Sequence, residues 1–460
     1  MHDVYIQYQF FTPMKHHKYA WIELGRRIDT VARAVHSRDA SLLESKAAHG
    51  LYRAAFEAER QNPWFTQASV VRSLQALAHM LRPGAVDKWL NTYFNHQEDT
   101  IDSKNKGQGL EDASNSTYKS QLLEDTDSTQ PSTSHNPQPA TCNPQPITIL
   151  LIMAGNIPLV GFHDMLCVLA SGHRLLAKVS SQDKELPLAM GRLIGGIEPA
   201  MTQRIEFVEG PALNFDAVIA TGSNNSSRYF DYYFGKHPHI IRRNRTSLAV
   251  LSGNESKEEL TALADDVFAY FGLGCRNVSM LWVPQGYDLE ALGEAWQGVG
   301  ETLRMHGKYM NNYDYQKAIM LVNKVPFTDT GFCMFREDAS LHSPVSVLHI
   351  QRYKNLNDLQ PFLAENRNAL QCIVTGLEVS RHLSGIQGQY LSEKPALSGK
   401  PDLFDEPDLS GKPNLSGKPG LSSKLGLSDT NSPLVPFGAG QTPELWDYAD
   451  GVDTMRFLLG

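Results

Sequence analysis

A single thiol stands between two kinds of structure in the stretch FAYFGLGCRNVSMLWVP, residues 268–284. A helical pattern runs up to Gly272 and Gly274, which are natural helix stops, and a short apolar strand follows. Cys275 is therefore expected in a tight loop between two buried elements, where functional residues tend to concentrate. A thiol in such a loop can serve as a covalent nucleophile. The alternative is a thiol that only packs in the interior.

The helix before Cys275 is expected to begin at a capping box formed by Ser256 and Glu259. Its apolar residues form one stripe that can pack against a sheet. The helix ends toward the thiol, and the partial negative charge of that end disfavours a thiolate. Activation of Cys275 must therefore come from Arg276, from nearby backbone amides or from a bound ligand.

Upstream, residues 147–251 alternate between apolar strands and helices. This alternation predicts a parallel sheet with crossover helices. Ligands of such sheets usually bind where the strands end and the loops begin. The expected strands lie at 147–153, 173–180, 204–210 and 215–223.

Polar residues lie at or just after the ends of several of these strands. Asn156 stands in AGNIP, Lys178 in LLAKVSS, and Thr221, Gly222 and Ser223 open TGSNN. Taken alone, Asn156 is typical of a turn before Ile-Pro, and Lys178 of a surface lysine at a strand end. TGSNN alone indicates a polar turn and a helix cap.

Composition excludes several classes of protein. The chain has 460 residues, a formal net charge of −8 and 41% hydrophobic residues, which disfavours a nucleic-acid binder. No apolar run reaches membrane-spanning length, and the first residues lack the pattern of a signal peptide, so we expect a cytoplasmic protein without a membrane span. The five cysteines form no C-x-x-C pair, so we expect neither a disulfide framework nor a metal site.

Two segments differ from the rest in composition. Residues 96–146 are rich in Ser, Thr, Asp, Asn, Gln and Pro, which predicts a disordered linker. Residues 389–432 contain a six-residue repeat of the type LSGKPN. A hexapeptide β-helix is one interpretation, but the recurrent proline removes a ladder donor, so a low-complexity insertion is favoured.

Several motifs together resemble one family. They are MAGNIPLVGFHDML, LASGHRLLAKVSS, ATGSNNSSRYFDYYFGKHPHIIRRNRTSLAVLSG and FGLGCRNVSMLWVP. In this order they are similar to the acyl-CoA reductases, which include the fatty-acid reductase component of bacterial bioluminescence and belong to the aldehyde dehydrogenase superfamily. The resemblance covers about residues 40–95, 147–388 and 433–460. It implies an aldehyde-dehydrogenase-like α/β fold, with a parallel α/β cofactor domain, an α/β catalytic domain and N-terminal helices.

The resemblance assigns the catalytic roles. Cys275 matches the nucleophile, and Asn156 matches the asparagine whose amide forms an oxyanion hole with the cysteine N–H. The chemistry agrees, because a thioester carbonyl attacked by a thiolate develops an oxyanion that fixed N–H donors stabilise.

The resemblance also implies a cofactor site. Lys178 matches the lysine that contacts the adenosine ribose, and Thr221, Gly222 and Ser223 match the TGS motif beside the cofactor. After this lysine the superfamily often has PSE, whose glutamate suits a free ribose hydroxyl and repels a 2′-phosphate. Here Ser181 stands in that place, which favours NADPH.

One departure from the superfamily bears on the reaction. Aldehyde-oxidising members carry a glutamate that activates water, and Arg242 stands in its place in RRNRTSL. A guanidinium cannot accept a proton, so hydrolysis of an acyl-enzyme should be slow. Arg242, Arg243 and Arg245 could instead form a solvated basic face or contact the phosphates of coenzyme A or the dinucleotide.

These patterns predict an NADPH-dependent oxidoreductase that reduces an acyl thioester to an aldehyde through an acyl-enzyme on Cys275. The donor would be acyl-CoA or an acyl-carrier thioester, and we expect a homo-oligomer. The alternatives are a non-catalytic acyl-binding or scaffold protein, and an aldehyde-oxidising dehydrogenase, which Arg242 disfavours.

The expected division of the chain has six parts. They are an N-terminal helical segment (1–95), with Ser41 and Glu44 capping its helix before residue 61, the linker (96–146), a dinucleotide-binding domain (147–248), a catalytic domain (249–388), the hexapeptide insertion (389–432) and a C-terminal segment that completes the fold (433–460).

Overall fold

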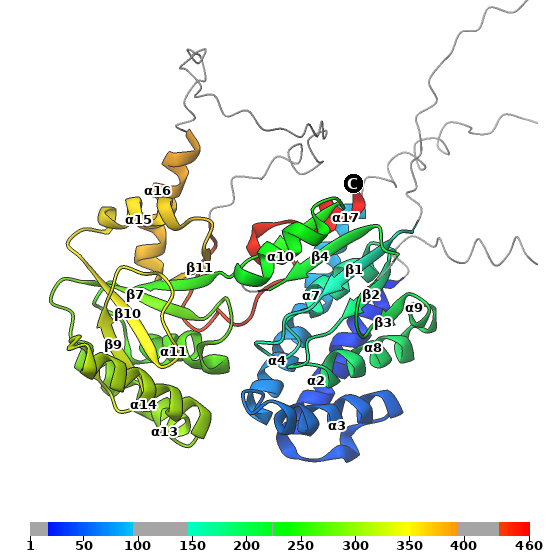
Figure 1. Cartoon of the computed structure of the whole chain (residues 1–460), viewed down its shortest axis with the longest axis horizontal. Helices are drawn as coiled ribbons and strands as arrows, with labels where there is room; N and C mark the ends of the chain where they lie inside the picture. The colour runs from blue at the N-terminus through cyan, green and yellow to red at the C-terminus, as the bar shows by residue number, and fades with distance from the viewer. Residues whose placement is uncertain (1–16, 95–145, 213, 223, 393–431) are drawn as a thin grey trace, which may run out of the picture.

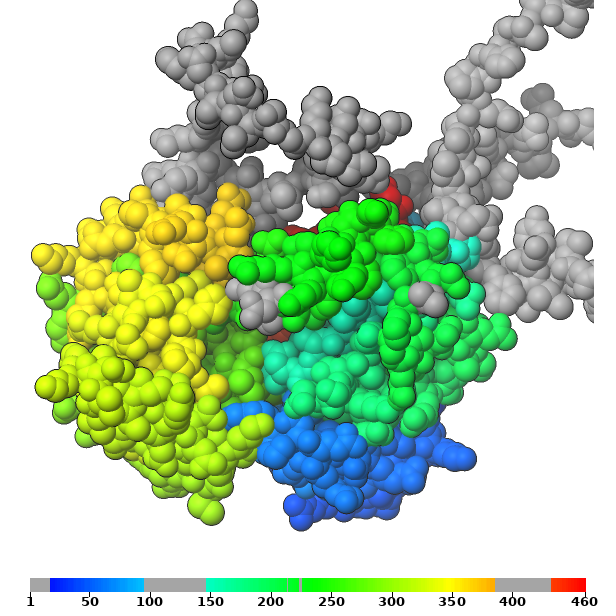
Figure 2. Space-filling view, in the orientation of Figure 1, coloured from blue at the N-terminus to red at the C-terminus, as the bar shows by residue number. Residues whose placement is uncertain are grey.

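The computed structural model of the chain describes residues 17–94, 146–212, 214–222, 224–392 and 432–460 (Figure 1). The predicted linker 96–146 and hexapeptide insertion 389–432 lie almost wholly outside the described residues, and Ser223 also lies outside them. The helices and strands gather in two α/β halves, which Figure 2 shows as two lobes that meet along a furrow.

The first half is built on a five-stranded parallel sheet in the order β3-β2-β1-β4-β5. Its central strands are short apolar runs, as expected for strands covered on both faces. The order reverses between β1 and β4, and open α/β sheets bind ligands at the carboxyl ends of strands beside such a reversal. The strands are β1 (Thr148–Ile152), β2 (Arg174–Lys178), β3 (Ile205–Phe207), β4 (Ala217–Thr221) and β5 (His239–Arg242); the helices between them are α7 (Phe162–Ala170), α8 (Glu185–Ile197), α9 (Pro199–Thr202) and α10 (Asn224–Phe234).

Four N-terminal helices extend this half. They bury an apolar stripe that joins the core of the first sheet, with Trp21, Leu51 and Trp89 almost fully enclosed. Helix α3 packs against α8, and α2 packs against α4. The four helices are α2 (Lys18–Ser37), α3 (Lys46–Gln61), α4 (Gln67–Met80) and α5 (Pro83–Phe94).

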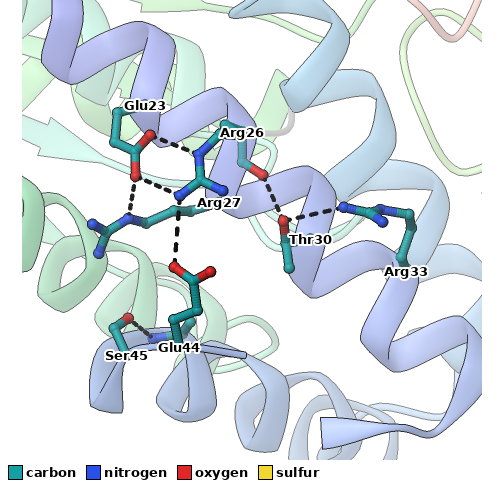
Figure 3. Close-up of polar contacts among 8 residues, drawn as sticks. Glu23, Arg26, Arg27, Thr30, Arg33, Glu44 and Ser45 are labelled. Carbon is teal, nitrogen blue, oxygen red and sulfur yellow. Dashed lines mark hydrogen bonds and ion pairs between the residues drawn. The ribbon is translucent and has the colours of Figure 1, made fainter. Parts of the chain in front are cut away.

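The predicted capping box at Ser41 and Glu44 is wrong. Ser41 lies in a 3₁₀ turn, η3 (Ala40–Leu42), whose cap is Asp39. Helix α3 begins four residues later than expected, and Ser45 caps it by accepting a hydrogen bond from Ala48 N at 3.1 Å. The carboxylate of Glu44 points instead toward Arg26, at 3.9 Å (Figure 3). A contact between α2 and the residue before the cap of α3 therefore replaces the local one.

Glu23 is the centre of a surface ion-pair network on α2 (Figure 3). Arg26 donates to its two carboxylate oxygens at 2.8 and 2.9 Å, and Arg27 donates at 2.7 Å. The hydrogen bond from Arg26 is the largest of the effects that lower the pKa of Glu23 to about 2. The network joins two consecutive turns of one helix.

The second half is built on a seven-stranded sheet in the order β12-β11-β6-β7-β10-β9-β8. Its strands are parallel except for the β8–β9 pair. The strands are β6 (Thr246–Val250), β7 (Val278–Pro284), β8 (Thr328–Asp329), β9 (Met334–Glu337), β10 (Val347–Tyr353), β11 (Leu370–Thr375) and β12 (Leu434–Val435).

Helices cover both faces of this sheet. The predicted capping box at Ser256 and Glu259 is confirmed at the start of α11. The helices are α11 (Lys257–Phe268), α12 (Leu289–Ala295), α13 (Gln297–Arg304), α14 (Gly307–Val322), α15 (Leu359–Asn366) and α16 (Leu377–Ser392), with the 3₁₀ turns η5 (Ala269–Gly272) and η6 (Leu356–Asp358). Within the described ranges, no helix combines the length and apolar character needed to cross a membrane.

The C-terminal residues 433–460 connect the two halves. They begin with β12 in the second sheet and end with α17 (Thr454–Leu459), which packs against α7 of the first half (Figure 1). Between them, the 3₁₀ turn η8 (Ala449–Gly451) lies beside β11. This segment therefore fixes one half against the other.

Candidate active site

The loop that carries Cys275 begins with an unusual run of backbone. After α11 ends at Phe268, Tyr270 and Phe271 have φ angles of 51° and 59°, and Gly272 follows at 78°. Bulky residues adopt the left-handed region only when packing enforces it. The Phe271 ring packs against the rings of Trp64 and His306, at 5.2 and 4.2 Å between centroids, and those two rings also stack on each other at 5.2 Å. Aromatic side chains from the N-cap of α14 and from the turn between α3 and α4 therefore support this loop conformation.

Asn277 is the polar residue that holds the loop after the thiol. It is 2% exposed, and its Oδ1 accepts a hydrogen bond from Gly274 N at 2.8 Å. Its Nδ2 donates to the last carbonyls of α11, those of Asp266 at 3.1 Å and Val267 at 3.3 Å, and to that of Ala269 at 2.8 Å. One side chain thus satisfies the helix end and fixes the backbone next to Cys275. The sequence did not single out Asn277, whose one signal is a polar residue directly before an apolar strand.

The C-terminal segment also contacts this loop and the end of α11. The carboxylate of Asp266 accepts hydrogen bonds from Gly438 N at 2.6 Å and Gly440 N at 2.8 Å. In return, Arg276 Nε donates to Gly440 O at 2.5 Å. The guanidinium that flanks the thiol is therefore part of the contact between loop and C-terminal segment.

Asn156 reaches the loop from the other half of the molecule. It lies in the turn after β1, and its Nδ2 donates to the carbonyl of Leu273 at 2.8 Å. An amide nitrogen carries two hydrogens, so this contact anchors the group and leaves a second donor for a ligand. The structure therefore brings Asn156 and the Cys275 loop together.

The surroundings of Cys275 favour the protonated thiol over the thiolate. Cys275 is half-buried by surface area, and burial raises the pKa of its thiol to about 11. The charge of Arg276 lowers this pKa, while the carboxylate of Asp450 raises it. Arg276 alone therefore does not produce a thiolate, and of the three sources of activation considered above, amides and a bound ligand remain.

The other predicted site residues lie along the carboxyl edge of the first sheet. Lys178 ends β2 and is half-buried, and its ammonium makes no ion pair or hydrogen bond with other described residues. Thr221 ends β4, with Gly222 next to it, and both are half-buried. Ser181 is exposed in the turn after β2.

This edge has the features of a ligand site in an open α/β sheet. It carries an uncommitted cation, and it stands at the reversal of strand order between β1 and β4. The backbone of the adjoining turns is closely packed, because a Cβ on Gly155 would lie 2.5 Å from Ser180 Oγ and one on Gly222 would lie 2.8 Å from the Phe230 ring. These turns therefore require glycine at positions 155 and 222.

Arg242 is neither on a solvated basic face nor free to contact phosphates, which corrects the interpretation from sequence. It is 3% exposed, and it donates to Asp164 of α7 through Nη2 at 2.6 Å and Nε at 3.2 Å. It also donates to Thr454 at 2.8 Å and to the carbonyl of Ala449 at 2.5 Å. The physical reason is that α17 and α7 close over β5 and bury the side chain. Its role is to join the C-terminal segment to the first half.

The neighbouring arginines differ from Arg242. Arg243 is exposed and pairs with Asp231 at 3.3 Å, whereas Arg245 pairs with Asp450 at 3.2 Å and is largely buried. Only Arg243 matches the expectation of a solvated basic residue.

Comparison with known proteins identifies the architecture. No family model matches the chain, and no curated protein matches it in sequence. Solved structures do match in three dimensions. Aldehyde dehydrogenase 21 from Physcomitrella patens aligns with a TM-score of 0.50 and 12% identity, over 79% of this chain and 76% of that one. The fold is that of the aldehyde dehydrogenases.

Two further solved structures agree. An NAD-dependent aldehyde dehydrogenase from Sinorhizobium meliloti aligns with a TM-score of 0.50 and 10% identity, over 79% of this chain and 72% of that one. An oxidoreductase from Marinobacter aquaeolei gives the same TM-score and 10% identity, over 81% and 76%. The predicted fold class is thus confirmed, and at this identity the likeness concerns the fold alone.

Proposed function

We propose that the chain is an NAD(P)-dependent oxidoreductase, and more narrowly that it reduces an acyl thioester to an aldehyde. The observation that carries this proposal is the hydrogen bond between Asn156 Nδ2 and Leu273 O at 2.8 Å, which holds an amide donor beside the Cys275 loop. In this proposal residues 147–248 bind the dinucleotide and residues 249–388 carry the thiol. The chain would act as a homo-oligomer on acyl-CoA or an acyl-carrier thioester.

The reaction begins at Cys275. Its sulfur forms a bond to the thioester carbonyl carbon, and the bond from that carbon to the thiol leaving group breaks. The thiol proton passes to the departing sulfur. Negative charge develops on the carbonyl oxygen, where the second N–H of Asn156 and the backbone N–H of Cys275 stabilise it. The product of this step is an acyl-enzyme.

The carboxyl edge of the first sheet would hold the cofactor. Lys178 would bind its adenosine ribose, while Ser181, Thr221 and Gly222 would line its site. Ser181 places a neutral hydroxyl where a glutamate would repel a 2′-phosphate, so NADPH is the preferred form. When bound, a reduced nicotinamide supplies the hydride that converts the acyl group to an aldehyde.

Arg242 supports reduction over hydrolysis. By the resemblance, Arg242 stands in the place of the water-activating glutamate, and its guanidinium is hydrogen-bonded to Asp164 and Thr454. It cannot accept a proton from water, so the acyl-enzyme should persist until hydride arrives.

A second candidate is an aldehyde-oxidising dehydrogenase, and one observation favours it. Asp450 is a largely buried carboxylate, close enough to raise the pKa of Cys275. It could replace the missing base. Burial raises the pKa of Asp450, which favours this role, whereas its ion pair with Arg245 at 3.2 Å lowers that pKa and opposes it.

The experiment is a substrate panel. The purified chain is incubated with acyl-CoAs of increasing length and NADPH or NADH, and separately with aldehydes and NADP⁺ or NAD⁺. We expect aldehyde to form in step with NADPH oxidation, and Cys275→Ala to abolish it. Oxidation of aldehydes to free acids, without acyl-CoA reduction, would establish the second candidate instead.

A further inference from the structure

The turn from Ser180 to Asp183 packs against the loop that carries Asn156. Asp183 N donates to Ser180 O at 3.2 Å, which closes the turn after β2. Asn62 Nδ2 donates to Gln182 O at 3.3 Å and ties the turn to the N-terminal helices. The turn is therefore held both internally and by the N-terminal helices.

The turn contacts the Asn156 loop on both sides of the asparagine. Before it, Ser180 packs against Gly155, where a Cβ would come within 2.5 Å of Ser180 Oγ. After it, Asp183 Oδ2 accepts a hydrogen bond from Leu159 N at 2.7 Å. Leu159 has a φ of 58°, a strained conformation for a leucine that the surroundings must enforce. The carboxylate is the group that meets this strained backbone.

Burying Asp183 lowers the stability of the folded protein more than a single backbone hydrogen bond would be expected to offset. It is 4% exposed, and its Oδ1 has no hydrogen-bond partner among the described residues. Burying a carboxylate with one oxygen unsatisfied costs stability, and burial raises the pKa of Asp183 to about 7. Strained backbone such as that of Leu159 clusters at functional sites. The part of the candidate site that Asp183 contacts is the loop that carries Asn156.

We propose that Asp183 is a positioning residue that aims the Asn156 amide at the Cys275 loop through its hydrogen bond to Leu159 N. The inference rests on the proposed function, because it assigns Asn156 to the oxyanion. It also joins two parts of the site: Ser181, which would line the cofactor site, lies in the same four-residue turn. Dinucleotide binding at this turn would thereby influence how Asn156 is held.

The test is a double-mutant cycle on acylation of Cys275. Asn156→Ala, Asp183→Ala and the double variant are compared by rapid thiol release from acyl-CoA, and separately by p-nitrophenolate release from p-nitrophenyl acetate. We expect Asp183→Ala to slow acylation about 10- to 100-fold, as a misplaced oxyanion donor would. The double variant should be no slower than Asn156→Ala alone. Effects that multiply would overturn the proposal.

Two controls separate positioning from folding. Alkylation of Cys275 by iodoacetamide needs no oxyanion hole, so Asp183→Ala should change its rate less than about twofold. Asp216→Ala removes a similar carboxylate-to-backbone bond, to Thr148 N at 2.7 Å, at the opposite end of β1. Acylation should be unchanged in this variant.

Asp183→Asn and Asp183→Leu keep the proposal testable if the alanine variant does not fold. Asparagine retains an acceptor for Leu159 N and should keep acylation within about threefold of the parent rate. Leucine fills similar volume without an acceptor and should reproduce the loss. Equal rates in the two variants would overturn the proposal.

The two acyl donors separate this inference from the proposed function. If acyl-CoA is not a substrate but the ester shows the expected pattern, the proposed function fails and the positioning role stands. If acyl-CoA is reduced and Asp183→Ala acylates at the parent rate, the positioning role fails alone.

Discussion

Asn156 and Leu273 come from different halves of the molecule, yet the amide nitrogen of one lies 2.8 Å from the carbonyl oxygen of the other. The contact joins the turn after β1 to the loop that ends at the thiol. The position of the Asn156 amide donor relative to Cys275 therefore depends on how the two halves pack against each other. The C-terminal segment contacts both halves, because Arg242 donates to Ala449 and Thr454 and Arg276 donates to Gly440.

The first prediction concerns the thiol. Because burial raises the pKa of Cys275 to about 11, the thiolate is the minor form at neutral pH and grows as pH rises. Its alkylation by iodoacetamide should therefore accelerate about tenfold per pH unit between roughly pH 7 and 10. Mass spectrometry of the labelled peptide measures it, with Cys275→Ser as the control. A rate that levels off below about pH 8 would show an activating group that this environment lacks.

A second prediction concerns Asn277. Replacement by alanine leaves the carbonyls at the end of α11 and the Gly274 N–H without their partner. We expect a loss of about 2–4 kcal/mol in the free energy of unfolding, as for a buried group with several hydrogen bonds. Urea denaturation measures it. Asn312→Ala, which removes one exposed bond on α14, is the matched control and should cost under about 0.5 kcal/mol.

A third prediction concerns Arg242. Substitution by glutamate would place a second carboxylate beside buried Asp164, so we expect loss of the fold and not a gain of hydrolysis. Arg242→Met should destabilise by about 3–5 kcal/mol, because Asp164 is left buried and unpaired. Adding Asp164→Leu should recover much of this loss. Exposed Arg243→Met is the control, and an equal loss there would contradict the assignment.

The fourth prediction is the pH dependence of the α2 network. The pKa of Glu23 is lowered to about 2, so its contribution to stability is present above its unfolded pKa and is lost as pH falls through about 2. Glu23→Gln should cost less than about 1 kcal/mol at neutral pH, because the network is solvent-screened, and nothing at the acid end. Thermal melts of both proteins across this range measure it. A larger effect at pH 2 than at pH 7 would contradict it.

Local sequence patterns predicted much of this architecture. Features that depend on contacts between segments far apart in the chain could not be predicted. Ser256 and Glu259 formed their capping box because both partners lie within one helical turn. The same spacing misled at Ser41 and Glu44, where Arg26 competes for the carboxylate. Arg242 could not be placed from sequence, since Asp164 and Thr454 are far along the chain and meet only when α17 closes on α7.

The residues of the candidate site also differ in whether the sequence could predict them. The glycines and the strand around Cys275 predicted its loop, and the resemblance brought Asn156 to it. Asn277 and Asp183 were not predicted, because a polar residue beside a strand gives no sign of what it will face after folding. Their roles depend on carbonyls and amides of other segments.

Thiol release from acyl-CoA, followed with and without NADPH, tests the acyl-enzyme most directly. Without cofactor we expect a burst of about one free coenzyme A per active site, followed by a stall, because Arg242 cannot activate water. Addition of NADPH should restart turnover and give aldehyde in step with oxidised cofactor. Steady release of coenzyme A without cofactor, at the rate of reduction, would contradict a reductase and show that another base resolves the acyl-enzyme.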